Sequence, residues 1–145
     1  MYLNAASYLG SILWAGVVIG ISFVAQPAKF KTPQLTRTAA LATGRQIFRS
    51  MHAVEAALAT ICILLSVFTA NQGIQRLMPL YAATLILLAQ VFILMPPLSR
   101  RVDLLLSGQE LQGSSHHLLF AVLEVIKLVL LLTFSLSLFT LTYHG

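Results

Sequence analysis

Four long apolar stretches dominate the chain, and shorter polar segments separate them. They cover about residues 5–27, 50–70, 77–97 and 117–142. A run of about 20 predominantly apolar residues is enough to cross the hydrocarbon core of a bilayer as a helix. The pattern therefore predicts four transmembrane helices in one integral membrane domain, residues 1–145.

The composition excludes a water-soluble globule. Hydrophobic residues make up 58% of the chain and charged residues only 9%, whereas soluble domains have about 25% charged residues. The net charge of +5 comes mainly from basic residues that flank the apolar stretches. No basic helix or aromatic-interleaved basic patch is present, so we expect the lipid bilayer, and no nucleic acid, as a partner.

The distribution of basic residues predicts the orientation. The segment 28–49 contains five Lys and Arg residues, the segment 98–116 contains two, and the turn between the second and third stretches contains one. The positive-inside rule places both long segments in the cytoplasm as loops, the first with some helical character after Pro33. We expect an all-α, up-down-up-down four-helix bundle in the inner membrane, with both termini on the extracytoplasmic side. Met95-Pro96-Pro97 should end the third span, because proline cannot donate to the helix ladder.

Ionic residues occur inside two of the predicted spans. A charge in hydrocarbon costs several kcal/mol, so such residues turn toward a protein partner or water. At 100° per residue, the polar side chains of the second span share an arc of about 120°, and those of the fourth share about 80°. We predict a buried cluster of Glu55, Arg101, His117, Glu124 and Lys127. Four further residues are candidates for the same cluster: Arg45, Arg49, His52 and Arg100.

Three roles for this cluster remain open. The first role is structural. Glu124 and Lys127 are i,i+3 neighbours and can neutralise each other, and Glu55 can pair with an arginine. Such pairs can fix helix register without any chemistry. Membrane-embedded carboxylates and histidines also mark proton or ion paths. The third role is a haem b or transition-metal site that uses His52 and His117. No nucleophile elbow, Walker loop or HExxH motif is present, so no catalytic residue is expected.

Small residues mark the first span. Gly16 and Gly20 have the small-xxx-small spacing that lets two helix backbones approach closely. The motif fits either a dimer seam or packing against another helix of the same chain, and we favour the second.

Several short motifs resemble an uncharacterised family of small bacterial four-span membrane proteins. They lie along most of the chain: Trp14-Ala15-Gly16, Ile21-Ser22-Phe23, Pro27-Ala28-Lys29-Phe30, Gly44-Arg45, Phe48, Glu55, Arg101, Gly108, His117, Glu124 and Lys127. The resemblance implies the four-span architecture and the choice of polar residues. It implies no activity, substrate or cofactor. His52 stands where the family pattern implies a small polar residue, which weakens its role as a ligand.

These observations predict a multi-pass membrane protein that is not an enzyme. We expect a small transport or permeation unit, or a membrane partner of a larger complex, with the polar cluster as its functional centre and without a cofactor. A homo-oligomer is one form such a complex could take. The alternative is a haem- or metal-binding redox protein that uses His52 and His117.

Overall fold

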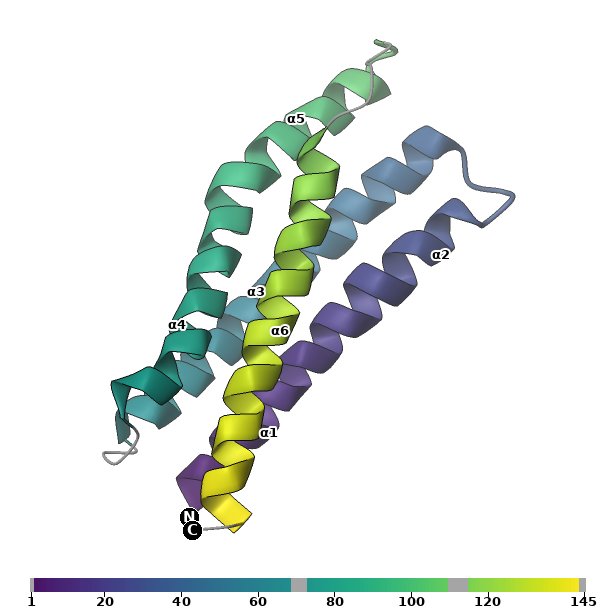
Figure 1. Cartoon of the computed structure of the whole chain (residues 1–145). Coiled ribbons are helices and arrows are strands. Elements are labelled where there is room, and N and C mark those ends of the chain that lie inside the picture. Colours follow the sequence, from purple (N-terminus) through teal and green to yellow (C-terminus); the bar gives the residue numbers. More distant parts are fainter. Residues whose placement is uncertain (1, 69–72, 110–114, 144–145) are drawn as a thin grey trace.

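The described part of the chain consists of helices joined by short turns (Figure 1). The computed structural model describes residues 2–68, 73–109 and 115–143, and side chains to residue 140. No strand occurs in these ranges. The elements are α1 (Tyr2–Val18), the π-helix η1 (Ile19–Ala25), α2 (Gln26–Phe30), α3 (Arg37–Phe68), α4 (Ile74–Ala89), the π-helix η2 (Gln90–Leu94), α5 (Met95–Leu106) and α6 (Ser115–Tyr143).

Successive elements join into four rods that are long and apolar enough to cross a membrane. The rods are Tyr2–Phe30, Arg37–Phe68, Ile74–Leu106 and Ser115–Thr140. This confirms the prediction of four helices that are long and apolar enough to span a membrane. The side of the membrane on which each loop and terminus lies stays a prediction.

Burial is inverted relative to a water-soluble protein. Glu55, Gln90, Glu124 and Lys127 are at most 1% exposed, while large apolar side chains such as Phe92 face outward. Such a surface suits lipid, and the buried polar groups must bond to one another because hydrocarbon offers no partners.

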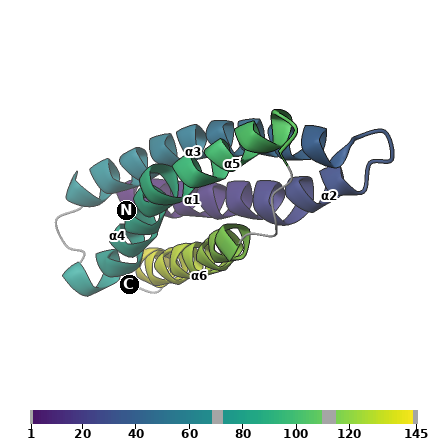
Figure 2. The same cartoon turned by 90° about the horizontal axis from the view of Figure 1, so that it is seen from above.

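The helices pack most closely toward the end that carries both termini. There α1 lies against α6 and α3, and α4 lies against α6. The apolar core at this end consists of Trp14, Ala15, Val18, Ala59, Cys62, Leu80, Ala83, Leu87, Leu131, Phe134 and Leu138. At the opposite end the rods spread apart (Figure 1), and the view from above shows α1 between α3 and α6 (Figure 2).

The predicted cytoplasmic loops are shorter than expected, because helices extend into both. α3 begins at Arg37, where Thr36 acts as its N-cap: the Thr36 hydroxyl accepts a hydrogen bond of 3.2 Å from the Ala39 N–H. The third rod runs to Leu106 and stops before Gly108, whose φ of 87° is the left-handed conformation typical of a helix end. Most of segment 28–49 is therefore helix rather than loop.

The expectation that the helix of the third span ends at Met95-Pro96-Pro97 is wrong, because the helix continues to Leu106, and the π-helices explain why. η2 directly precedes these prolines, and the Met95 N–H bonds to the Gln90 carbonyl five residues earlier. η1 likewise ends just before Pro27, with the Gln26 N–H bonded to Ile21. A proline ring clashes with the carbonyl four residues earlier in a regular helix. The wider π turn relieves this clash, so each helix continues through its prolines.

The favoured interpretation of Gly16 and Gly20 is also wrong. Both are exposed, and a Cβ atom added to either would meet no atom within 4 Å. The small residues that do pack lie on the other face of α1: Ser7, Ser11 and Ala15 are buried, and Ser11 hydrogen-bonds to Ser135 of α6 at 2.7 Å. The helix contact therefore uses serine and alanine, and the glycines face outward.

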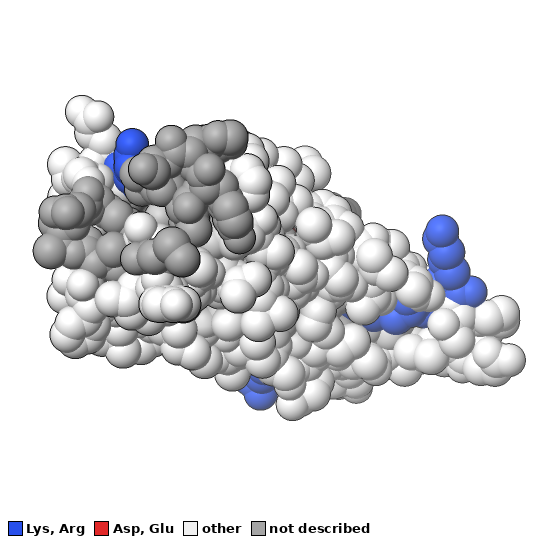
Figure 3. Space-filling model, turned by 90° about the horizontal axis from the view of Figure 1, so that it is seen from below, with Lys and Arg blue, Asp and Glu red and all other residues white. Residues whose placement is uncertain are grey.

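Basic side chains gather around α2 and the start of α3. Lys31 and Arg37 are exposed there, and Figure 3, drawn from the end that carries the termini, shows blue side chains at its right-hand end, where these elements lie. This placement is compatible with the predicted cytoplasmic orientation of that end.

Candidate functional site: a buried ionic cluster

Two carboxylates share one ammonium group in the middle of the bundle. The Lys127 Nζ atom of α6 lies 2.6 Å from Glu55 Oε1 of α3 and 2.8 Å from Glu124 Oε1, one turn earlier on α6. All three side chains are at most 1% exposed. The sequence predicted that these three residues face one another, and the structure brings them into direct contact.

Neutral polar groups from the other two rods complete the cluster. Gln90 accepts from Lys127 through Oε1 at 2.8 Å and donates through Nε2 to Glu124 Oε1 at 2.6 Å. The Ser22 hydroxyl donates to Glu124 Oε2 at 2.8 Å, and Trp14 Nε1 donates to Glu55 Oε1 at 2.8 Å. Every rod therefore contributes at least one polar side chain, and these hydrogen bonds fix each helix relative to the others.

The π-helices position two of these groups. Ser22 lies in η1 and Gln90 in η2. An extra residue in a helical turn rotates the following side chains relative to the regular spacing, and such turns are frequent at functional sites. Both π-helices therefore position a polar side chain that donates a hydrogen bond to the same carboxylate, that of Glu124.

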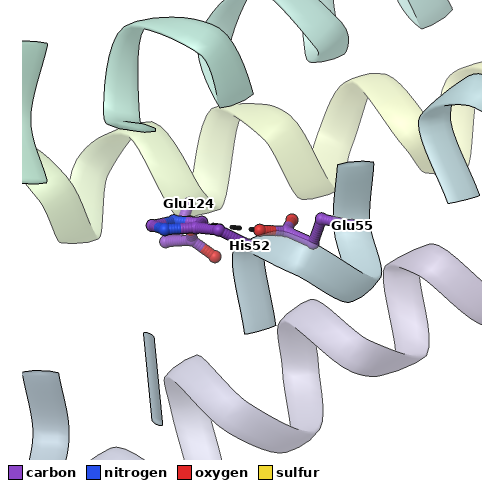
Figure 4. Close-up of side chains that lie close together, drawn as sticks. All are labelled: His52, Glu55 and Glu124. Atoms are coloured by element: carbon purple, nitrogen blue, oxygen red, sulfur yellow. Dashed lines mark ion pairs between the residues drawn. The ribbon is translucent and has the colours of Figure 1, made fainter. Parts of the chain in front are cut away.

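His52 lies beside the cluster without completing its bonding. The side chain is 5% exposed and packs against the Phe48 and Phe120 rings. Its Nε2 atom is 3.9 Å from Glu55 Oε2, and neither atom has a hydrogen-bond partner (Figure 4). This separation is too long for a hydrogen bond. Two buried polar atoms thus face each other across a gap that one small donor could bridge.

The cluster contains more negative than positive charge when both carboxylates are ionised. Glu55 and Glu124 carry two negative charges, and Lys127 supplies one positive charge. The surrounding Trp14, Ser22 and Gln90 are neutral. An unpaired charge is expensive in a buried site, so the surplus favours the binding of one additional positive charge.

Four other predicted residues do not take part in the buried ion pairs. Arg45 forms an ion pair with Asp103 and donates to the Ser99 carbonyl at 3.3 Å. Arg49 and Arg100 are exposed, and Arg101 is half-buried. The expectation that an arginine neutralises Glu55 is wrong, because Lys127 already occupies that position.

His117 is exposed, so its predicted burial in the cluster is also wrong. It lies seven residues before Glu124 on α6, which is about 10 Å along the axis at 1.5 Å per residue. His117 is therefore near the end of the rod, whereas Glu124 is inside the bundle.

Two hollows lead from the surface toward the cluster. One of about 330 Å³ lies among η1, α2, α3 and α6, and both Ser22 and Glu124 line it. The other, of about 560 Å³, lies between α3 and the η2–α5 segment, and His52 and Arg49 line it. The apolar core lies toward the other end of the bundle. The polar cluster thus borders open space on the α2 and α5 side.

The family comparison is informative once this geometry is known. Residues 9–103 match the model of the family described as "Domain of unknown function (DUF4149)". The chain belongs to the DUF4149 family. The matched range contains Trp14, Ser22, Glu55 and Gln90. Neither the curated proteins nor the solved structures gave a match.

Three cluster residues of this DUF4149 protein lacked a clear signal in the sequence. Gln90 stands out as the strongly polar residue inside the third span, which was a usable signal, but nothing in the spacing showed which residue it faces. Trp14 reads as a packing residue, and Ser22 as one of several small residues in the first span. Their hydrogen bonds depend on how the rods pack and on the two π-helices.

The structure changes which residues could bind a metal ion. His52, Glu55 and Glu124 each offer a ligand atom, all within 4.8 Å of one another. His117 is exposed and is not part of this group. Lys127 already holds one oxygen of each carboxylate, and a divalent ion there would lie next to this ammonium group. Charge repulsion therefore favours a single positive charge over a divalent metal ion.

Gly44 offers a test of the packing between α2 and α3. A Cβ atom at Gly44 would overlap the Lys29 ammonium group, which also bonds to Gln26. We expect Gly44→Ala to displace Lys29 and, relative to Gly16→Ala in the helix α1, to lower the free energy of unfolding by about 1 kcal/mol, the usual value of one hydrogen bond. Chemical denaturation in detergent measures this difference. Gly16→Ala is the control, since its Cβ meets open space, and equal effects of the two substitutions would contradict the prediction.

Proposed function

We propose that this protein is a small transport unit of the membrane, in which the buried cluster binds and releases one proton. The observation that carries the proposal is the sharing of Lys127 by two fully buried carboxylates. One proton makes the cluster neutral and removes the surplus negative charge. Protonatable groups inside a membrane commonly lie on proton or ion paths.

The vacant hydrogen-bonding positions indicate where the proton would reside. Glu55 Oε2 and His52 Nε2 are unpartnered and 3.9 Å apart. A proton on either atom supplies the missing donor, and a small rotation or one bridging water closes the gap. The titratable groups that face this position are Glu124 and Lys127 of α6, while α1, η1 and η2 contribute only the neutral Trp14, Ser22 and Gln90.

Access to the cluster supports a transport role over a purely structural one. The hollows beside Glu124 and His52 give a solute or water a route from the α2 and α5 side. The apolar core separates the cluster from the opposite end. A transporter exposes its site to one side at a time, and we assign this arrangement to the state open toward the basic end. Four short spans are few for a complete pathway, so the proposal includes assembly with a second copy of the chain.

Infrared spectroscopy tests proton binding without knowledge of the substrate. We expect the purified wild-type protein to show a buried carboxylic-acid C=O band at acidic pH that disappears at alkaline pH. Glu124→Gln and Glu55→Gln should each abolish this band. In either variant the negative charge of the remaining carboxylate is neutralised by the positive charge of Lys127, so the cluster binds no additional proton. Asp103→Asn is the control: Asp103 is an exposed carboxylate outside the cluster, and the band should persist. A wild-type band that survives both Glu→Gln substitutions would refute the proposal.

A further inference from the structure

Four phenylalanines line the hollow beside Glu124, together with the polar side chains of Gln26 and His117. Phe23, Phe30, Phe48 and Phe120 line it, and Ser22 and Glu124 lie at its inner end. Its volume of about 330 Å³ is within the usual range of small-molecule sites, roughly 300–1,000 Å³. A ligand that fits must therefore be largely apolar and must present a polar or charged group to Glu124.

Charge determines which polar group fits best. Glu124 Oε1 already accepts from Lys127 and Gln90, whereas Oε2 accepts only from Ser22, a neutral donor that lines the same hollow. The cluster carries a surplus negative charge when both carboxylates are ionised. The inner end of the hollow is therefore complementary to a cation and unfavourable for an anion.

The ammonium group of Lys29 lies over two of these rings, in a neighbouring hollow that Phe30 and Phe48 also line. Lys29 Nζ lies 4.9 Å from the centre of the Phe30 ring and 6.0 Å from that of Phe48. Both distances are within the range of cation–π attraction. Phe30 and Phe48 line both hollows, and each ring has a face that accepts a positive charge.

We propose that this hollow binds a hydrophobic organic cation, an amine or quaternary ammonium with an aromatic group. Its rings would lie against the phenylalanines, and its positive charge would face Glu124 Oε2. This inference rests on the proposed function, because the same surplus charge would hold either the proton or the cation. The two should therefore compete, and the cation would be the transported substrate.

Equilibrium dialysis of radiolabelled benzyltrimethylammonium against the purified full-length protein tests the inference. The probe has no titratable proton, so any pH dependence comes from the protein. We expect saturable binding that weakens as the pH falls, and no displacement by benzenesulfonate or benzyl alcohol. Glu124→Gln should weaken binding about 10-fold or more, as expected for loss of a charged partner.

Matched phenylalanine variants locate the site. Phe120→Leu should weaken binding several-fold, whereas Phe68→Leu, at an exposed position at the end of α3, should leave it unchanged. Equal displacement by the anionic or neutral compound, or full binding by Glu124→Gln, would overturn the inference. If the infrared band behaves as proposed but no probe binds at any pH, the substrate assignment fails alone. If the probe binds through Glu124 and the band is absent, the proton proposal fails instead.

Discussion

Replacing Lys127 with methionine should strongly destabilise the folded state. Lys127 is fully buried and bonds to Glu55, Glu124 and Gln90. Without the ammonium group, two buried carboxylates are left facing each other with no positive charge. Removal of one partner from a buried ion pair typically costs about 3–5 kcal/mol, which is a large share of the usual stability of a domain. Thermal unfolding and yield in detergent measure the loss.

A matched control and a rescue variant separate this effect from the general loss of a lysine. Lys31 is exposed just beyond α2, and Lys31→Met should change stability by no more than about 0.5 kcal/mol. Adding Glu55→Gln to Lys127→Met removes one of the stranded charges and should recover about 1 kcal/mol or more. A Lys127→Met protein that is as stable as the wild type would show that the cluster does not hold the helices together.

Much of this cluster was predictable from chemistry that acts on one residue at a time. Charged side chains avoid hydrocarbon, and this single constraint correctly predicted that Glu55, Glu124 and Lys127 face inward. The apolar lengths likewise predicted the four spans. Both inferences need only the position of a residue along its helix, which the sequence provides directly.

The remaining contacts depend on distances between helices. Gln90 and Ser22 reach Glu124 from π-helices, and an irregular turn changes the direction of side chains relative to the regular 100° spacing. Arg45, Arg49 and His117 shared the right face of an ideal helix, yet they lie nearer the rod ends, where water is a better partner than the cluster. Angular position was therefore a weaker predictor than depth, because long basic side chains readily reach an interface.

Exchanging Glu124 and Lys127 should be almost as damaging as removing the lysine. If the two residues formed an isolated pair, the double variant Glu124→Lys with Lys127→Glu would keep the pair and much of the stability. In the structure, however, position 127 also contacts Glu55 at 2.6 Å. The exchange brings two carboxylates together there and moves the ammonium group toward Ser22. We expect a loss of about 3 kcal/mol or more, as for an uncompensated buried charge, measured by denaturation in detergent.

The ion pair between Arg45 and Asp103 provides the control for this exchange. Arg45 and Asp103 also join two helices, but the Asp103 side chain is 64% exposed. Their exchange should cost less than about 1 kcal/mol, because water screens both charges. Adding Glu55→Gln to the Glu124–Lys127 exchange should then restore part of the stability, since position 127 no longer faces a like charge. If the exchanged protein is stable without that third substitution, Glu55 is not electrostatically coupled to position 127, and a shared positive charge cannot explain the site.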